Sequence, residues 1–437
     1  MKSGGVVITG LGAVSPLGLT ASEMWAALCA GKCGIGTIRA FDPAGFACKI
    51  AGEVPGFKIQ HYVPRSARKA TKLMSRNIEL AVVAAAEAVK DSGLVTKATD
   101  PEKVNLDPTR MGINIGAGLI SCDLIEMAPA VAHSVTGGTF DIHKWGKEGL
   151  DLVTPLWLLK YLPNMLACHT GIIHDIQGPS NTITCAEASA HIAMAEAAQV
   201  IERGGCDIAL AGGAEAKVHP IILMRQILLK RATTENNDEP DRACRPFDSA
   251  AKGSVFGDGA GIVVLENENN AERRGARIYA RLAGAGQSIS INPAYEHLEP
   301  DGRAVTIAIE KALEDAGIGP EQLDLVIPHG TGIPGDDLAE AKGIAAALGE
   351  TAGKVAVWPT KSMLSTTGAA SGVLDVIAAV CAMRDGVIPA AKNFDNRVEG
   401  CELNIVTKEQ KKDIRCALCC SYTYGGQTAA VVLKKLN

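Results

Sequence analysis

Short apolar runs that end in glycine recur along the chain and predict β-strands. Between them lie alanine-rich segments in which apolar residues recur at helical spacing. Alternating strands and helices predict a mainly parallel sheet with helices on its faces. The strand-like runs cover residues 6–10, 111–118, 181–186, 207–215, 261–266, 278–286, 323–332, 354–362 and 416–435, and the helix-like segments cover residues 77–93, 188–203, 304–316 and 338–348.

The set of strand-like runs appears twice, once before residue 266 and again after residue 276. This repetition predicts two related halves, residues 1–266 and 267–437, joined by a charged segment. Thr20 and Glu23 have the spacing of a capping box, which predicts that the first helix begins there.

Composition excludes several classes of protein. Of the 437 residues, 47% are apolar and 21% are charged, which is the balance of a folded α/β protein. The formal charge of −5 gives no general attraction to nucleic acid or to anionic membranes. No apolar run reaches the roughly 18 residues of a membrane span, and the N-terminal stretch reads as a strand rather than a signal peptide. We therefore expect a cytoplasmic protein.

The cysteines and glycines do not form a recognisable metal or nucleotide site. The 13 cysteines are scattered, and Cys416 and Cys419 form a CxxC that lacks a second pair or a nearby histidine. We interpret that segment as a buried strand and expect no bound metal. Gly10 and Gly12 only partly match a dinucleotide-binding turn, so we expect no cofactor.

Four segments carry candidate chemistry: residues 178–215, 245–266, 329–337 and 361–372. In the first, a strand is predicted up to about residue 186 and a helix from about residue 188. The sharp turn between them would display one side chain at the helix N-terminus, where free N–H groups and the helix dipole favour an anion.

With VVITGLGAVSPLG near the N-terminus and SYTYGGQT near the C-terminus, these segments resemble the β-ketoacyl-acyl-carrier-protein synthases over essentially the whole chain. The resemblance is to the elongating, type II enzymes. It implies the thiolase fold, in which two pseudo-repeated halves form a five-layered αβαβα body that dimerises through a sheet edge.

The family uses a cysteine to take the acyl chain, two histidines to assist decarboxylation, and a lysine that supports the second histidine. Counting along residues 178–204 without a gap places the nucleophile position on Glu187 and not on Cys185. His329 takes the first histidine position and Lys361 the lysine position, but Thr366 stands where the second histidine is expected. Cys185 could be the nucleophile only if the turn had shifted by two residues.

These two replacements change the expected function. A carboxylate would form a mixed anhydride, which is a poor store of an acyl group, and threonine cannot share a proton as an imidazole does. The chain therefore resembles the chain-length factors of type II polyketide synthases, which do not condense and which pair with an active ketosynthase subunit. This resemblance predicts a heterodimer in fatty acid or polyketide biosynthesis.

Other interpretations remain open. The chain could be a homodimeric enzyme with altered chemistry, such as a malonyl-carrier decarboxylase or an acyltransferase, that uses His329 with Glu187 or Cys185. It could also bind an acyl chain without reaction. In the simplest case Glu187 is an anion held by the helix, His329 is structural, and Lys361 is the buried partner of Glu187 or of another acid.

The resemblance also implies contacts with a substrate carried on the phosphopantetheine of an acyl carrier protein. Thr331 matches a threonine that meets the pantetheine arm. Tyr422 and Tyr424 lie in the SYTYGG segment, and Tyr424 matches a gating phenylalanine.

Two further segments bear on partners. Residues 64–76 carry basic side chains at helical spacing, and the resemblance implies that such a helix docks the carrier protein, although a solvated face is an equal alternative. The cations assigned to docking are Arg65, Arg68, Lys69 and Lys72. Residues 119–160 form a longer connection than the family usually has, and we expect them to shape a partner contact or an unusual acyl tunnel.

Overall fold

The computed structural model describes residues 4–292 and 297–436. Residues 1–3 of the first predicted half, and residues 293–296 and 437 of the second, lie outside the described residues. The centre of the structure is an 11-stranded sheet. In sheet order the strands are β14 (Asn404–Ile405), β12 (Ala356–Val357), β11 (Leu325–Ile327), β16 (Cys416–Tyr422), β17 (Gln427–Lys434), β10 (Ala280–Ile289), β1 (Val6–Val14), β9 (Gly259–Asn267), β8 (Ile208–Glu215), β4 (Met111–Ala117) and β7 (Ser180–Ile183).

The predicted mainly parallel sheet is wrong, because parallel pairing is confined to the two ends of this sheet. Strands β14, β12, β11 and β16 pair in parallel at one end, and β8, β4 and β7 do so at the other. Every pair between β16 and β8 is antiparallel. The physical reason is the chain path. A short turn joins β16 to β17, so these two strands run in opposite directions, and β1 lies between β9 and β10 and is antiparallel to both.

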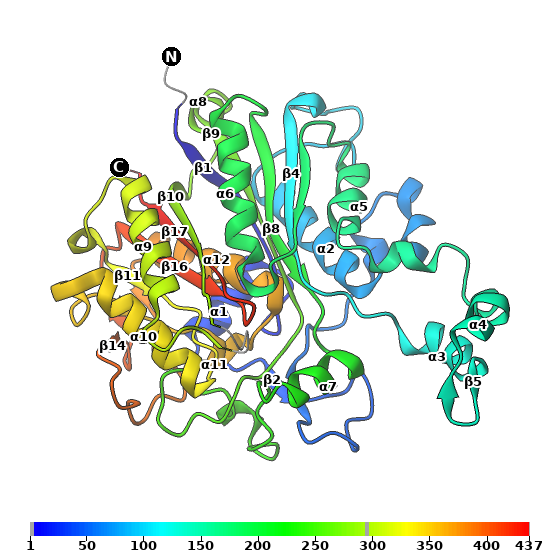
Figure 1. Ribbon diagram of the computed structural model, residues 1–437. Helices are drawn as coiled ribbons and strands as arrows, with labels where there is room; N and C mark the ends of the chain where they lie inside the picture. Colours follow the sequence, from blue (N-terminus) through cyan, green and yellow to red (C-terminus); the bar gives the residue numbers. More distant parts are fainter. Residues whose placement is uncertain (1–3, 293–296, 437) are drawn as a thin grey trace.

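Helices cover both faces of the sheet (Figure 1). Short two-stranded ribbons complete the structure: β2 (Ile35–Thr37) with β3 (Ile50–Gly52), β5 (Val135–Thr136) with β6 (Thr139–Phe140), and β13 (Val387–Ile388) with β15 (Gln410–Lys411). The helices are α1 (Ala21–Cys29), α2 (Arg76–Asp91), α3 (Leu124–His133), α4 (Ile142–Lys144), α5 (Met165–His174), α6 (Ser189–Glu202), α7 (Pro220–Leu228), α8 (Glu268–Arg273), α9 (Arg303–Ala316), α10 (Pro334–Leu348), α11 (Lys361–Leu364) and α12 (Ser371–Asp385).

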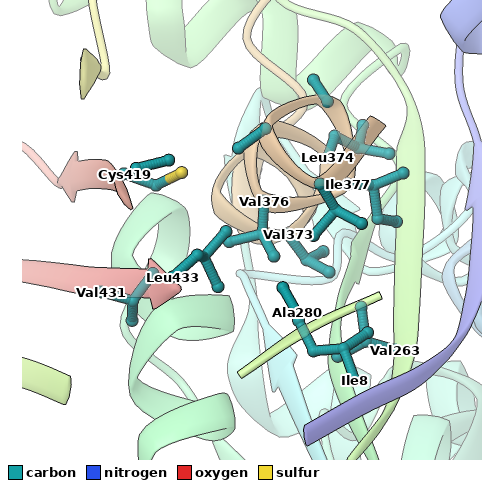
Figure 2. Close-up of a cluster of buried hydrophobic side chains, with 14 of the residues drawn as sticks. Ile8, Val263, Ala280, Val373, Leu374, Val376, Ile377, Cys419, Val431 and Leu433 are labelled. Atoms are coloured by element: carbon teal, nitrogen blue, oxygen red, sulfur yellow. The ribbon is translucent and has the colours of Figure 1, made fainter. Parts of the chain in front are cut away.

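Helices α6 and α12 form the middle layer of the molecule. Both contact strands from the two ends of the sheet, whereas α2 covers β1 and β9 and α9 covers β10 and β17 on the outside. Almost all of α12 is buried. Figure 2 shows its side chains between two groups of strand residues; the labelled residues are Val373, Leu374, Val376 and Ile377 on α12, Ile8, Val263 and Ala280 on one side, and Cys419, Val431 and Leu433 on the other.

The two middle helices begin in the same way. At α6 the Cys185 N–H donates to Ser189 Oγ (2.8 Å), and at α12 the Thr367 N–H donates to Ser371 Oγ (3.0 Å). In each case a 3₁₀ turn precedes the helix. The two turns belong to the motif segments 178–215 and 361–372, and they lie directly before the two middle helices. The division at residues 266 and 267 falls at the end of β9 and stays a prediction.

Several local predictions are confirmed. Thr20 caps α1 by accepting the Glu23 N–H (3.1 Å), and the Glu23 carboxylate accepts the Leu19 N–H (2.8 Å). Cys416 and Cys419 are buried in β16 and belong to a strand, as predicted. No helix in the described residues is both long enough and apolar enough to cross a membrane.

Residues 122–160, which we call the lobe, project from the body of the molecule (Figure 1). The lobe contains α3, the β5–β6 ribbon, α4 and three short helical turns. Many of its apolar side chains are exposed, and Ala130 is the only buried residue of α3. The exposed ones are Leu124, Ile125, Val131, Val135, Phe140, Ile142, Leu150, Leu152, Leu156 and Leu158. An apolar surface of this extent is typical of a contact with another protein.

The middle layer predicts a large difference between two leucines. Leu374 on α12 is 1% exposed, whereas Leu228 on α7 is 75% exposed. We expect Leu374→Ala to lower the free energy of unfolding by about 2–5 kcal/mol through lost burial and the cavity left behind. Leu228→Ala is the matched control and should change it by less than about 0.5 kcal/mol. Chemical denaturation of both variants measures the difference; equal losses would contradict the layer assignment.

Candidate active site

Glu187 lies in the strand-to-helix turn between β7 and α6, inside the 3₁₀ turn Ala186–Ala188. The backbone reaches this turn through Ala186, whose φ of 41° is left-handed and unusual for a residue with a Cβ. Such a conformation persists only where the surrounding structure holds it. Here the Ser189 hydroxyl holds it by accepting the Cys185 N–H and donating to Ala117 O (3.0 Å).

The Glu187 carboxylate is paired with Lys217, which is not among the site residues predicted from the sequence. Lys217 Nζ lies 3.1 Å from Glu187 Oε1 and 3.3 Å from Glu215 Oε1. Glu215 Oε2 accepts the Ala369 N–H (2.8 Å) from the turn before α12. All three charged side chains are buried, and Glu187 itself is 6% exposed. One lysine at the end of β8 therefore holds two carboxylates together.

Burial has the largest single effect on Glu187 and raises its pKa, but Lys217, His329, a backbone hydrogen bond and Arg231 together outweigh it, so the pKa lies below its usual value. Burial has the opposite effect on Lys217, whose pKa is nevertheless raised by the two carboxylates. Burial raises the pKa of Glu215, and Lys217 only partly opposes that rise. Position 187 is consequently a permanent anion with a fixed counter-charge.

His329 lies in the turn after β11, and two acids of α10 hold that turn in place. Glu340 accepts the backbone N–H groups of His329 (2.6 Å) and Gly330 (2.8 Å). Asp337 accepts those of Thr331 (2.8 Å) and Gly332 (3.0 Å). Burial raises the pKa of Asp337 to about 7 and that of Glu340 to about 8. The turn is thus fixed by buried carboxyl groups that titrate near neutral pH.

The His329 ring is enclosed and neutral. It is 1% exposed and packs edge-on against Tyr422, with ring centroids 4.7 Å apart. Burial and the nearby Lys361 charge hold the pKa of His329 well below its usual value. Its Nδ1 is buried and has no hydrogen-bond partner among the described residues. A neutral imidazole with a free ring nitrogen can still donate or accept a hydrogen bond.

Of the two alternatives for Lys361, the structure selects another acid and not Glu187. Its ammonium forms a buried ion pair with Asp375 on α12 and also contacts Thr360 Oγ1 (3.4 Å). Thr366 lies at the predicted second-histidine position, but its hydroxyl is hydrogen-bonded to Ser254 Oγ (2.7 Å) and the residue is 2% exposed. Its one polar group is therefore used in the core.

The residues predicted to contact the substrate differ in burial: Thr331 is buried, whereas Tyr424 is exposed to solvent. Thr331 is buried, and its hydroxyl donates to Asp337 Oδ1 (3.3 Å) within the turn. Tyr424 is half-exposed in the turn between β16 and β17, where the Arg231 guanidinium lies 5.6 Å from its ring centroid. Arg231 also pairs with Asp336 Oδ2 (3.0 Å), and its charge acts on both Glu187 and His329. Tyr424 thus lies beside a buried cation of the site.

The predicted basic helix is wrong. Residues 65–73 form two 3₁₀ turns, Arg65–Ala67 and Ala70–Leu73, and α2 begins only at Arg76. Two short turns cannot place four side chains on one α-helical face. The four cations assigned to docking are nevertheless exposed, and none forms an ion pair with a described residue.

All four residues Glu187, His329, Lys361 and Thr366 are buried, and His329 interacts electrostatically with both Glu187 and Lys361. It does not place Cys185 in a reactive setting, because burial raises the pKa of that thiol. The motifs missed Lys217 and Arg231. A signal for Lys217 exists in hindsight: a lysine two positions after the glutamate that ends a buried strand needs a carboxylate partner.

Comparison with known proteins decides the family. The N-terminal domain of the β-ketoacyl synthases matches residues 4–271, and their C-terminal domain matches residues 279–395. The chain belongs to the β-ketoacyl synthase family. Its fold is of the thiolase type, as predicted.

Several known proteins match the chain over essentially its full length. It is 35% identical over 436 residues to the 3-oxoacyl-[acyl-carrier-protein] synthase 2 of Vibrio cholerae, covering 99% of both chains. Among solved structures, the ishigamide ketosynthase/chain length factor is similar with a TM-score of 0.84 and 28% identity over 100% of both chains. A type II polyketide synthase acyl-carrier protein in complex with its ketosynthase bound to the hexaketide gives a TM-score of 0.84 and 26% identity, again over 100% of both chains.

The raised pKa of Glu340 predicts a pH-dependent effect of Glu340→Gln. In the unfolded chain the pKa of a glutamate is about 4.3, whereas the pKa of Glu340 in the folded protein is about 8. The wild type should therefore lose stability as the pH rises from the first value to the second. The glutamine side chain of the variant cannot ionise and should not show this loss. The difference in Tm between variant and wild type should therefore move in favour of the variant by several degrees between about pH 5 and pH 9.

Thermal unfolding across that pH range measures the effect. Glu350→Gln, at an exposed position, is the control and should give a constant difference. A Glu340→Gln difference that does not change with pH would show that Glu340 ionises normally.

Proposed function

We propose that this chain is a non-condensing β-ketoacyl synthase homologue of chain-length-factor type, which acts in fatty acid or polyketide biosynthesis as the partner of an active ketosynthase. One observation carries the proposal: the side chain at the acyl-accepting position is a carboxylate that Lys217 neutralises at 3.1 Å. The relative from Vibrio cholerae is a synthase, so the proposal rests on this chain's own residues rather than on that relative's activity.

Chemistry argues against condensation at this site. An elongating synthase stores the acyl group as a thioester, which requires a thiolate nucleophile. The Glu187 carboxylate is a weak nucleophile, and its pairing with Lys217 lowers its basicity further. Thr366 supplies no imidazole, and its hydroxyl is engaged by Ser254. Removing cooperating groups from an active site costs several orders of magnitude in rate.

The lobe supports a partner of the same family. Its exposed apolar side chains would be unfavourable in a monomer, and an obligate interface of roughly 2,000 Å² or more would cover them. The likeness to a ketosynthase/chain length factor fits a paired assembly. We also propose an acyl carrier protein as a further partner, which delivers the substrate on phosphopantetheine. The exposed cations Arg65, Arg68, Lys69 and Lys72 are complementary to an acidic carrier protein.

A second candidate is favoured by the enclosed His329. Its buried, unpartnered Nδ1 could donate a hydrogen bond to a thioester enolate, and Lys361 is retained beside it. These groups are consistent with a homodimeric enzyme that decarboxylates malonyl-carrier protein without condensing it. We propose no metal and no cofactor for either candidate.

Co-expression with a co-encoded, complete Cys-His-His synthase tests the choice. We expect a stable heterodimer by size exclusion with light scattering, and condensing activity that neither chain shows alone. The matched variant Leu156→Asp, Leu158→Asp places charges on the exposed lobe, and it should reduce heterodimer formation by tenfold or more because charge is costly in an apolar interface.

A monodisperse homodimer that binds none of the co-encoded synthases would contradict the proposed role as the partner of an active ketosynthase. If that homodimer also released carbon dioxide from malonyl-carrier protein, the decarboxylase would replace it as the proposal. Loss of that release in a His329→Ala variant would tie it to this site.

A further inference from the structure

The charged cluster of Glu187, Lys217 and Glu215 is enclosed by parts of both halves of the chain. Gly118 and Gly368 face Glu215 so closely that neither position has room for a Cβ, and Gly368 also contacts the Lys217 side chain. The Phe256 ring lies on another side, with its centroid 5.5 Å from Lys217 Nζ. Water therefore has little access to the three charges.

The cluster has unequal bonds to its surroundings. Glu215 has a second partner in the Ala369 N–H, so it keeps one strong hydrogen bond even without Lys217. Glu187 has only a local interaction with its own backbone N–H, and its Oε2 is buried without a hydrogen-bond partner among the described residues. A buried carboxylate without a counter-ion is strongly unfavourable. Glu187 consequently depends on Lys217 far more than Glu215 does.

We propose that Lys217 is a positioning residue that fixes Glu187 as a permanent anion at the start of α6, so that positions 187 and 217 form one functional unit. The unit fills the acyl-accepting position of the fold with the chain's own ion pair. The effect of replacing Lys217 therefore depends on whether position 187 carries a carboxylate. This inference does not rest on the proposed partner, because a homodimer would have the same coupling.

A double-variant cycle tests the coupling in the full-length protein. The variants are Glu187→Gln, Lys217→Met and the two together. Lys217→Met leaves Glu187 buried without a partner and should lower the Tm strongly. Glu187→Gln leaves Lys217 paired with Glu215 and should lower it less. The double variant should be more stable than Lys217→Met alone, although it carries one more change.

The pH profile gives a readout that simple loss of packing would not produce. Besides Lys217, the titratable or charged groups near Glu187 are the neutral His329 in the β11 turn, the Arg231 cation after α7, and Glu215 at the end of β8. Without Lys217, burial would dominate and raise the Glu187 pKa, so Lys217→Met should lose stability as the pH rises above roughly 4.3. The double variant has no carboxyl at 187, and the gap between the two should widen from about pH 4.5 to about pH 7.5.

An exposed ion pair of the same chemistry is the control. Lys435 Nζ lies 2.9 Å from Asp413 Oδ1 at the surface, where both residues are exposed, so Lys435→Met and Asp413→Asn should combine almost additively. If Lys217→Met fails to fold and the double variant folds, the coupling is demonstrated directly. A double variant that is no more stable than Lys217→Met at any pH in this range overturns the proposal, whatever the oligomeric state or partner.

Discussion

The ion pair between Lys217 and Glu187 is the interaction on which the functional account depends. A carboxylate in the closed turn before α6 would be strongly destabilising without a counter-charge, because its Oε2 is buried and no described residue donates a hydrogen bond to it. Lys217 removes that penalty and makes the anion permanent. In the proposed non-condensing function, the same contact that makes Glu187 compatible with the fold also keeps it from accepting an acyl group.

The fold explains why this contact can form. Strand β8 ends at Glu215, and Lys217 follows two residues later, so both side chains lie at the same strand end, where Lys217 contacts Glu187 and Glu215. The turn before α12 closes the region from the other side through Ala369. Lys361 and Asp375 form a separate buried pair on and beside α12. The region therefore holds two separate buried ion clusters, one formed by Lys217 with Glu187 and Glu215 and the other by Lys361 with Asp375.

Much of the fold could be predicted from sequence because its signals are local. Alanine-rich helical spacing located α2, α6, α9 and α10, and glycine-ended apolar runs located most strands of the central sheet. Strand direction could not be predicted in this way, because β1 pairs with β9 and β10, which lie far from it in sequence. The prediction of a basic docking helix over residues 64–76 was wrong for a different reason. Its cations have helical spacing in the sequence, but the backbone there forms two 3₁₀ turns.

The site was predictable only where motifs mark it. Glu187, His329 and Lys361 follow from the spacing of their segments, but their partners do not. Lys217 and Asp375 lie outside the predicted site residues and become identifiable only when distant strand and helix ends meet. A buried charge requires a partner somewhere in the fold, and sequence alone does not say which residue supplies it.

The most direct test of the central claim is intact-mass and peptide mass spectrometry of the purified chain after incubation with an acyl-carrier-type or cerulenin-type electrophile. If position 187 is a neutralised carboxylate and Cys185 an unreactive thiol, neither residue should gain mass, while a complete Cys-His-His synthase treated in parallel should be labelled at its nucleophile. A stoichiometric adduct on Glu187 or on Cys185 would contradict the account, because it would show that this turn still accepts an acyl group.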